Sequence, residues 1–175
     1  FKRIFLMLRK HYVVAFSVKS YFRLVDSLLH QNPLVSFLYK RGWRQNFNRS
    51  GFPGPDEDFK MAQEYFKPAE GGLFVDVSCG SGLFSREFAK SGTYSGVIAL
   101  DFSETMLRQC CDLIIKDATI LNPNLALVRA DVSRLPFSLG SVDVVYAGAA
   151  LHCWPSPSNA MSNSSFIQFL CRNLI

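Results

Sequence analysis

The chain has 175 residues, of which 49% are hydrophobic and 19% are charged, so it can bury the core of one domain and does not have the composition of a disordered chain. Its net charge of +5 comes entirely from residues 1–32, and the balanced remainder disfavours a nucleic-acid-binding surface. No apolar run reaches the roughly 18–20 residues that a membrane-spanning helix needs, although peripheral membrane contact stays open.

The first segment in chain order, residues 1–32, is a basic and apolar leader with six basic side chains and one acid. Its first part, residues 1–24, fits either a targeting segment or an amphipathic surface helix. The chain begins with Phe1 rather than Met, so we expect a fragment or a processed product.

Residues 33–70 are predicted to form an N-terminal helical cap. Apolar side chains recur at helical spacing in two stretches, 34–47 and 56–66. A loop rich in proline and glycine at residues 50–55 separates them, because neither a helix nor a strand continues through it. We therefore place a domain boundary at residue 70.

In residues 71–160, short apolar runs of strand length alternate with amphipathic stretches of helical length. This alternation predicts a doubly wound α/β domain with right-handed crossovers and a mostly parallel, Rossmann-like sheet covered on both faces. The predicted strands are 73–77, 96–100, 125–128 and 142–147, and the predicted helices are 83–90 and 103–117. Residues 155–165 are rich in Ser, Pro and Asn and are predicted to be a loop.

The stretch V-D-V-S-C-G-S-G, which ends at Gly82, joins the first predicted strand to the first helix of this domain. Ligands of open parallel sheets bind beyond the carboxyl ends of the strands, where glycines let the backbone turn sharply. Gly80 and Gly82 match the first two positions of a dinucleotide fingerprint, but Ser85 occupies the third. Asp76 would repel a pyrophosphate and suits an ammonium group. We therefore expect S-adenosylmethionine rather than a nicotinamide cofactor, with a plain tight turn as the alternative.

Two further acids follow the next strands. Asp101 ends the second predicted strand, where a carboxylate accepts hydrogen bonds from ribose hydroxyls. Asp131 follows the third strand, where it would accept from the adenine amine while the Val132 amide donates to a ring nitrogen. Phe102 and Met106, close behind Asp101, are added as candidate cofactor-binding residues. Asp101 and Asp131 each have a structural alternative, as helix N-caps or turn formers.

Four ordered motifs carry a family resemblance over residues 33–160. They are V-D-V-S-C-G-S-G, V-I-A-L-D-F-S-E-T-M-L, R-A-D-V-S-R-L-P-F and S-V-D-V-V-Y-A-G-A-A-L-H-C-W. Together they resemble the type 11 class I methyltransferases, relatives of the ubiquinone and menaquinone C-methyltransferases. The preceding stretch, R-G-W-R-Q-N-F-N-R-S-G-F-P-G-P-D-E-D-F, is closer still to plant chloroplast methyltransferases. The resemblance implies a chloroplast location and methyl transfer to a small-molecule acceptor such as a quinone or a lipid-like compound.

The resemblance also assigns roles to residues of the site. It implies that Asp76 and the loop hold the methionine end of S-adenosylmethionine, Asp101 the ribose and Asp131 the adenine. One departure from the family is Ser78, where glycine is usual, because a serine tolerates fewer backbone angles. The expected cofactor-binding residues are Asp76, Ser78, Gly80, Gly82, Asp101, Phe102, Met106, Asp131 and Val132.

No motif of the sequence identifies a catalytic residue. His152 follows the fourth predicted strand and is the candidate base, or else it shapes the turn before Trp154. Trp154 would stack on a flat acceptor or pack on the helix layer. Cys79 and the Cys110-Cys111 pair are expected to be small buried hydrophobic residues. The five cysteines include no C-x-x-C pair, so we predict neither a metal site nor a disulfide framework.

The last expectation concerns residues 161–175, a tail that departs from the family pattern. The methyltransferase fold has seven strands, and the sequence of this chain predicts four. We expect the sheet to stop after the fourth strand and to leave residues 142–147 as an unpaired edge. The chain alone would then be an inactive fragment, and a nicotinamide-dependent oxidoreductase is the other alternative. The acceptor and the oligomeric state stay open.

Overall fold

The computed structural model of the chain describes residues 54–120, 124–138, 140–148, 150 and 153–161. Several of the predicted features lie outside these ranges. They are the leader at residues 1–32, the helix expected at 34–47, the candidate base His152 and the tail beyond residue 161.

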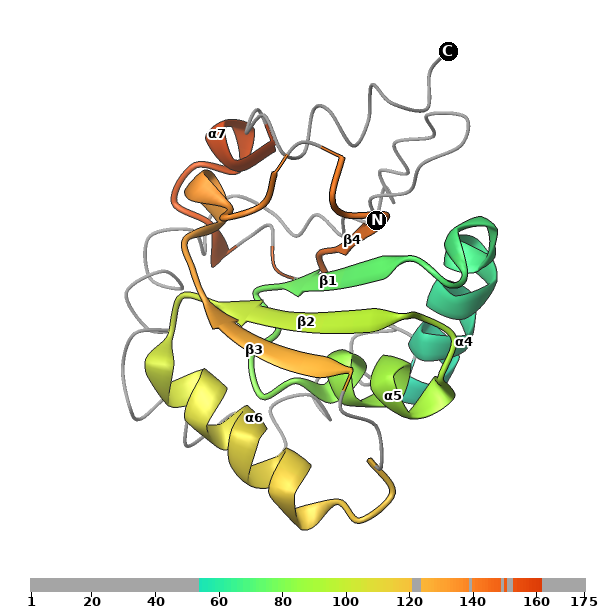
Figure 1. Cartoon of the computed structure of the whole chain (residues 1–175). Helices are drawn as coiled ribbons and strands as arrows, with labels where there is room; N and C mark the ends of the chain where they lie inside the picture. Colours follow the sequence, from blue (N-terminus) through green and yellow to red (C-terminus); the bar gives the residue numbers. More distant parts are fainter. Residues whose placement is uncertain (1–53, 121–123, 139, 149, 151–152, 162–175) are drawn as a thin grey trace.

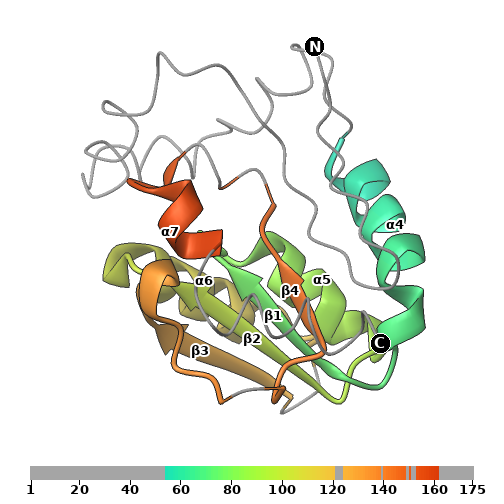
Figure 2. The same cartoon turned by 90° about the horizontal axis from the view of Figure 1, so that it is seen from above.

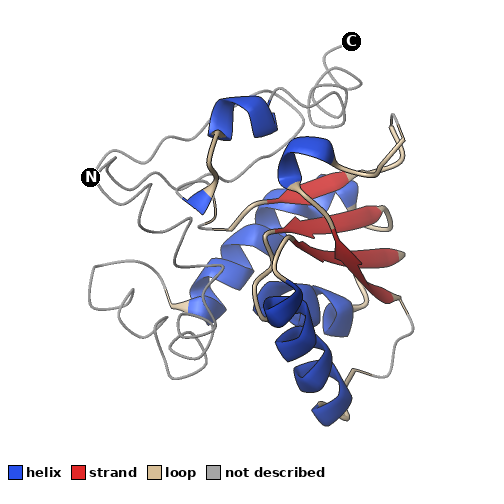
Figure 3. Cartoon of the chain, turned by 90° about the vertical axis from the view of Figure 1, so that its left-hand side faces the viewer, coloured by secondary structure: helices blue, strands red, loops and turns tan. Residues whose placement is uncertain are grey.

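Within the described residues, four parallel strands form one sheet, in the order β3-β2-β1-β4. Their bounds are β1 Leu73–Val77, β2 Gly96–Asp101, β3 Leu125–Arg129 and β4 Val144–Tyr146. Figure 2 shows this order across the sheet, and Figure 3 shows that the strands run in one direction. The Rossmann-like parallel sheet predicted from the alternation of elements is therefore confirmed.

The helices connect the strands and cover the sheet. Their bounds are α4 Pro55–Phe66, α5 Leu83–Ser91, α6 Glu104–Lys116 and α7 Pro157–Met161, with the 3-10 helices η2 Lys67–Ala69 and η3 Val132–Arg134. In Figure 1, α5 and α6 lie on one side of the strands and α7 lies on the other. Local chemistry sets the helix ends: Gly92 closes α5 with a φ of 65°, and the Ser103 hydroxyl accepts from the Met106 amide to cap α6.

Two predicted segments differ from the structure by more than one residue. Within the loop predicted at residues 155–165, Pro157–Met161 form α7, because a proline at the first helical position has no amide to satisfy. β4 has three residues instead of the predicted 142–147. Just before its start, the Asp143 carboxylate, rather than a backbone carbonyl, accepts from the Leu73 amide at 2.8 Å, while the Asp143 amide donates to the Leu73 carbonyl at 3.0 Å. Among the described strands, β4 pairs with β1 alone.

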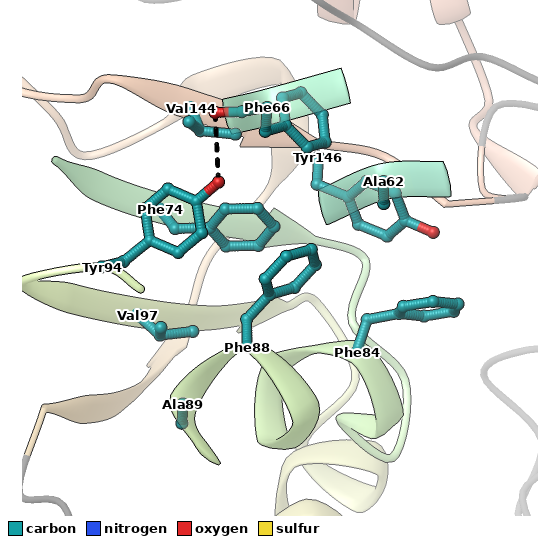
Figure 4. Packing of buried hydrophobic residues seen from close by; sticks show 10 residues of the cluster. All are labelled: Ala62, Phe66, Phe74, Phe84, Phe88, Ala89, Tyr94, Val97, Val144 and Tyr146. Atoms are coloured by element: carbon teal, nitrogen blue, oxygen red, sulfur yellow. Dashed lines mark hydrogen bonds between the residues drawn. The ribbon is translucent and has the colours of Figure 1, made fainter. Parts of the chain in front are cut away.

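Two buried clusters lie on opposite faces of the sheet, because alternate residues of a strand point to opposite sides. The aromatic cluster, on the side of α4 and α5, surrounds the fully buried Phe74, whose ring centroid lies 4.2 Å from that of Phe88 (Figure 4). Burial raises the pKa of Tyr94 to about 12, so its hydroxyl stays protonated and donates to the Phe66 carbonyl at 3.4 Å. The second cluster, on the side of η3 and α7, contains Val75, Val77, Leu100, Leu135, Val145, Ala147, Ala150, Trp154 and Ala160.

Replacing Phe74 with alanine should lower the free energy of unfolding by about 3–5 kcal/mol, because the lost ring leaves a cavity among other rings. Phe102→Ala is the matched control, since the Phe102 side chain is 54% exposed and its loss should change stability by less than about 0.5 kcal/mol. Urea unfolding of the full-length protein measures both values. Equal losses in the two variants would contradict the central position of Phe74.

Gly82, at the start of α5, is buried against α6 and has a φ of 70°. A Cβ at this position would overlap the Sγ of Cys110, whereas Gly92 has a similar φ of 65° and nothing within 4 Å of such a Cβ. Gly82→Ala should therefore destabilise the protein by about 1–3 kcal/mol more than Gly92→Ala, as overpacking does. The same unfolding measurement in a Cys110→Ala background should remove most of this excess. Indistinguishable effects of the two glycine variants would show that the contact with α6 is not tight.

Candidate functional site

Three candidate acids lie along one edge of the sheet. Asp76 belongs to β1, Asp101 ends β2, and Asp131 stands just beyond the end of β3. Because these strands are parallel and adjacent, their carboxyl ends meet at the same edge, where ligands of such sheets bind. The structure thus brings together acids that are far apart in the sequence.

Asp76 is buried, with 3% of its surface exposed, and it caps the helix that follows the loop. Its Oδ2 accepts from the Ser85 amide at 3.1 Å and from the Ser85 hydroxyl at 2.5 Å. The N-cap residue of α5, Gly82, has no side chain for this task, so a carboxylate from the neighbouring strand satisfies the helix and meets its positive end. In the sequence, Asp76 and Ser85 are two separate departures from a dinucleotide fingerprint, and in the structure they are hydrogen-bond partners.

Three amides of the loop between β1 and α5 donate to acceptors inside the chain. The Cys79 amide donates to the Leu100 carbonyl at 3.0 Å, and the Gly80 amide donates to Oδ2 of Asp101 at 2.8 Å. The Gly82 amide donates to the Cys79 carbonyl at 2.9 Å. A phosphate-binding loop presents its amides to the ligand. Here these three amides donate within the chain instead, which disfavours a pyrophosphate at this loop.

Asp101 forms the turn that leads into α6. Its Oδ1 accepts from the Ser103 amide at 2.8 Å, and its Oδ2 accepts from the Gly80 amide. These two bonds use only part of the roughly four acceptor positions of a carboxylate, so a turn-forming role is compatible with ribose binding. Beside it, the Phe102 side chain is 54% exposed, whereas Met106 is buried in the first turn of α6.

Asp131 is the N-cap of η3, which agrees with the helix-capping role given as an alternative to ligand binding in the sequence analysis. Its Oδ1 accepts from both the amide and the hydroxyl of Ser133 at 2.8 Å, and no hydrogen bond from the described residues reaches its other oxygen. These bonds hold the pKa of the Asp131 carboxyl below its usual range, so at neutral pH the side chain is an acceptor only. Val132 is the first residue of η3 and packs against the second cluster.

Ser78 follows β1 with a φ of 58°. A non-glycine residue in the left-handed region is less stable by about 1–2 kcal/mol. Ser78, which stands where the family usually has glycine, therefore strains the backbone at this point. The Ser78 Oγ accepts from Nε1 of Trp154 at 2.9 Å. Trp154 is 4% exposed and packs in the second cluster. Of its two expected roles, the structure therefore agrees with packing rather than with stacking on an acceptor. No sequence signal indicates this bond, because 76 residues separate its partners.

Cys79 of the loop and Cys110 of α6 are buried, as expected for small hydrophobic residues, whereas Cys111 is only half-buried. Cys79 lies with Cys110 of α6 in one buried group, and contact with Cys110 together with burial raises the pKa of the Cys79 thiol well above its usual value. A neutral thiol is a poor nucleophile. Within the part of the chain that the structure describes, no group of three His, Cys, Asp or Glu side chains could hold a metal ion, and no helix is long and apolar enough to cross a membrane.

Comparison with known proteins gives one family. A family model described as a methyltransferase domain matches residues 75–165. Two uncharacterized chloroplastic methyltransferases of Arabidopsis thaliana are 74% and 61% identical to this chain over 79% and 78% of its length, and the chain spans only about 40% of theirs. A SAM-dependent methyltransferase from Aquifex aeolicus shares the fold, with a TM-score of 0.54 and 19% identity over 63% of this chain and 57% of that one. The chain therefore belongs to the methyltransferase-domain family, whose members use S-adenosylmethionine.

Proposed function

We propose that the full-length protein transfers the methyl group of S-adenosylmethionine to a small-molecule acceptor and that this chain supplies the cofactor site. The capping of α5 by Asp76 carries the proposal. It places a negative charge where a phosphate would otherwise bind, and it leaves a row of carboxylates that suits hydroxyl and amine donors. S-adenosylmethionine offers such donors and contains no phosphate.

The candidate residues divide the cofactor between them. Asp101 accepts from the ribose hydroxyls, with the exposed Phe102 ring and the buried Met106 beside it. Asp131 accepts from the adenine amine, and the Val132 amide donates to a ring nitrogen. The loop that contains Ser78, Gly80 and Gly82 borders the methionine end. Asp76 holds the end of that loop in place by accepting hydrogen bonds from Ser85 of α5.

The cofactor, when bound, supplies a methyl group on a sulfonium that is already a good leaving group. The protein therefore has to align the acceptor with that group and exclude water, and alignment can supply ~7–11 kcal/mol. His152 is the proposed base where the acceptor needs one, and it lies outside the described residues.

The acceptor and the location follow from likeness to other proteins. The sequence resembles the ubiquinone and menaquinone C-methyltransferases, which supports a quinone or another lipid-like acceptor. Two Arabidopsis relatives are named chloroplastic, which supports a chloroplast location for this protein. Assays of the full-length protein with labelled S-adenosylmethionine and a panel of plastid quinones and lipids identify the acceptor.

Calorimetric titration of the full-length protein with S-adenosylhomocysteine and with NADH tests the cofactor. We expect S-adenosylhomocysteine to bind and NADH not to bind. Asp101→Asn keeps one acceptor oxygen but removes the charge, and it should weaken S-adenosylhomocysteine by about tenfold, since a hydrogen bond to a charged group contributes roughly 1.5–3 kcal/mol. Binding of NADH without S-adenosylhomocysteine would instead support a nicotinamide-dependent oxidoreductase.

The adenine contact is tested at Asp131 with two substitutions. Asp131→Ser retains a good N-cap for η3 and removes the carboxylate oxygen that no described residue contacts. Asp131→Asn keeps the shape and loses the charge. Both should weaken adenosine and S-adenosylhomocysteine alike by about tenfold, measured by calorimetry, because both ligands carry adenine. Unchanged affinity in the serine variant would leave Asp131 with its capping role alone.

A further inference from the structure

Ser78 occupies a backbone position that suits glycine. It is the one non-glycine residue with a positive φ, 58°, among the described residues. A side chain at such a position is unfavourable unless its surroundings compensate for the strain. The hydrogen bond between the Ser78 hydroxyl and Trp154 is the compensation that the structure offers.

The partner of Ser78 is held rigidly. An indole N–H can only donate, so the Ser78 oxygen is the acceptor of this 2.9 Å bond. The Trp154 ring is 4% exposed and packs with Val77, Leu100 and Ala150 in the second cluster, which leaves it little freedom to move. The indole N–H of Trp154 is therefore a fixed donor that holds Ser78, the first residue of the loop.

The conformation of Ser78 sets the direction of the backbone that follows. The next two amides, those of Cys79 and Gly80, donate to the Leu100 carbonyl and to Asp101. A change of φ at Ser78 would move both amides away from β2, and it would release the bond that helps to orient the Asp101 carboxylate. The loop and the proposed ribose-binding acid thus depend on one strained residue.

We propose that Trp154 is a positioning residue for the cofactor site, acting through Ser78. Its indole N–H stabilises the left-handed conformation of Ser78, which in turn holds the loop amides and Asp101 in the arrangement that binds S-adenosylmethionine. The inference rests on the proposed function, and it connects the segment after β4 to the loop after β1, 76 residues earlier.

Paired substitutions in the full-length protein test this chain of contacts. Ser78→Ala keeps the Cβ and removes the acceptor, whereas Ser78→Gly removes the acceptor and the strain together. We expect calorimetry to show S-adenosylhomocysteine about tenfold weaker in Ser78→Ala and in Trp154→Phe, which corresponds to about 1.4 kcal/mol. Ser78→Gly should lose less affinity than Ser78→Ala, and combining it with Trp154→Phe should bring the affinity back to that of Ser78→Gly alone.

A second packing variant separates positioning from general loosening of the core. Leu135→Ala disturbs the same second cluster but leaves the indole bond in place, so Ser78→Gly should not restore any affinity that it loses. Equal losses in Ser78→Ala and Ser78→Gly would overturn the inference, because the hydroxyl would then act on the ligand directly. Failure of Ser78→Gly to rescue Trp154→Phe would overturn it as well.

The inference and the proposed function fail in different ways. If the parent protein does not bind S-adenosylhomocysteine, the proposed function fails. The link between Ser78 and Trp154 is then measured by urea unfolding of the parent, Ser78→Gly, Trp154→Phe and the double variant. Ser78→Gly should again offset the loss caused by Trp154→Phe, and additive effects of the two substitutions would overturn the link.

Discussion

The corner between β1 and α5 depends on a single buried carboxylate. Asp76 lies on the α5 side of β1, and the amide and hydroxyl that it accepts from belong to the third residue of the helix. A buried carboxylate is stable only where such donors compensate for its desolvation. The contact fixes the helix against the strand, helps to determine where the loop passes between them, and places a negative charge at a helix terminus that would otherwise attract phosphate.

The two faces of the sheet have different tasks. The aromatic cluster around Phe74 joins α4 and α5 to the strands and gives the domain much of its buried apolar surface. The second cluster brings η3 and α7 under the other face, with Trp154 among its members. Through Trp154 and Asp131, this second face reaches the carboxyl edge of the sheet, so packing on the side away from α5 also influences the candidate site.

Sequence patterns predicted those features that local chemistry determines. The strand predicted at 73–77 matches β1 to the residue, and the helices predicted at 83–90 and 103–117 match α5 and α6 to within one residue at each end. The row of acids also follows, because parallel strands align their carboxyl ends. The bonds from Ser85 to Asp76 and from Trp154 to Ser78 could not be predicted, since they depend on how separate elements pack. The length of β4 was missed for the same reason, because an aspartate side chain replaces a backbone acceptor.

The position of Trp154 has an optical consequence. The chain contains two tryptophans, and this one is almost fully buried with its N–H bonded to a residue of the loop. An indole in such apolar surroundings fluoresces at shorter wavelengths than one in water, and its emission responds to changes in polarity around the ring. In a Trp43→Phe variant, the fluorescence of Trp154 alone would report both the integrity of the second cluster and the state of the loop, without any attached dye.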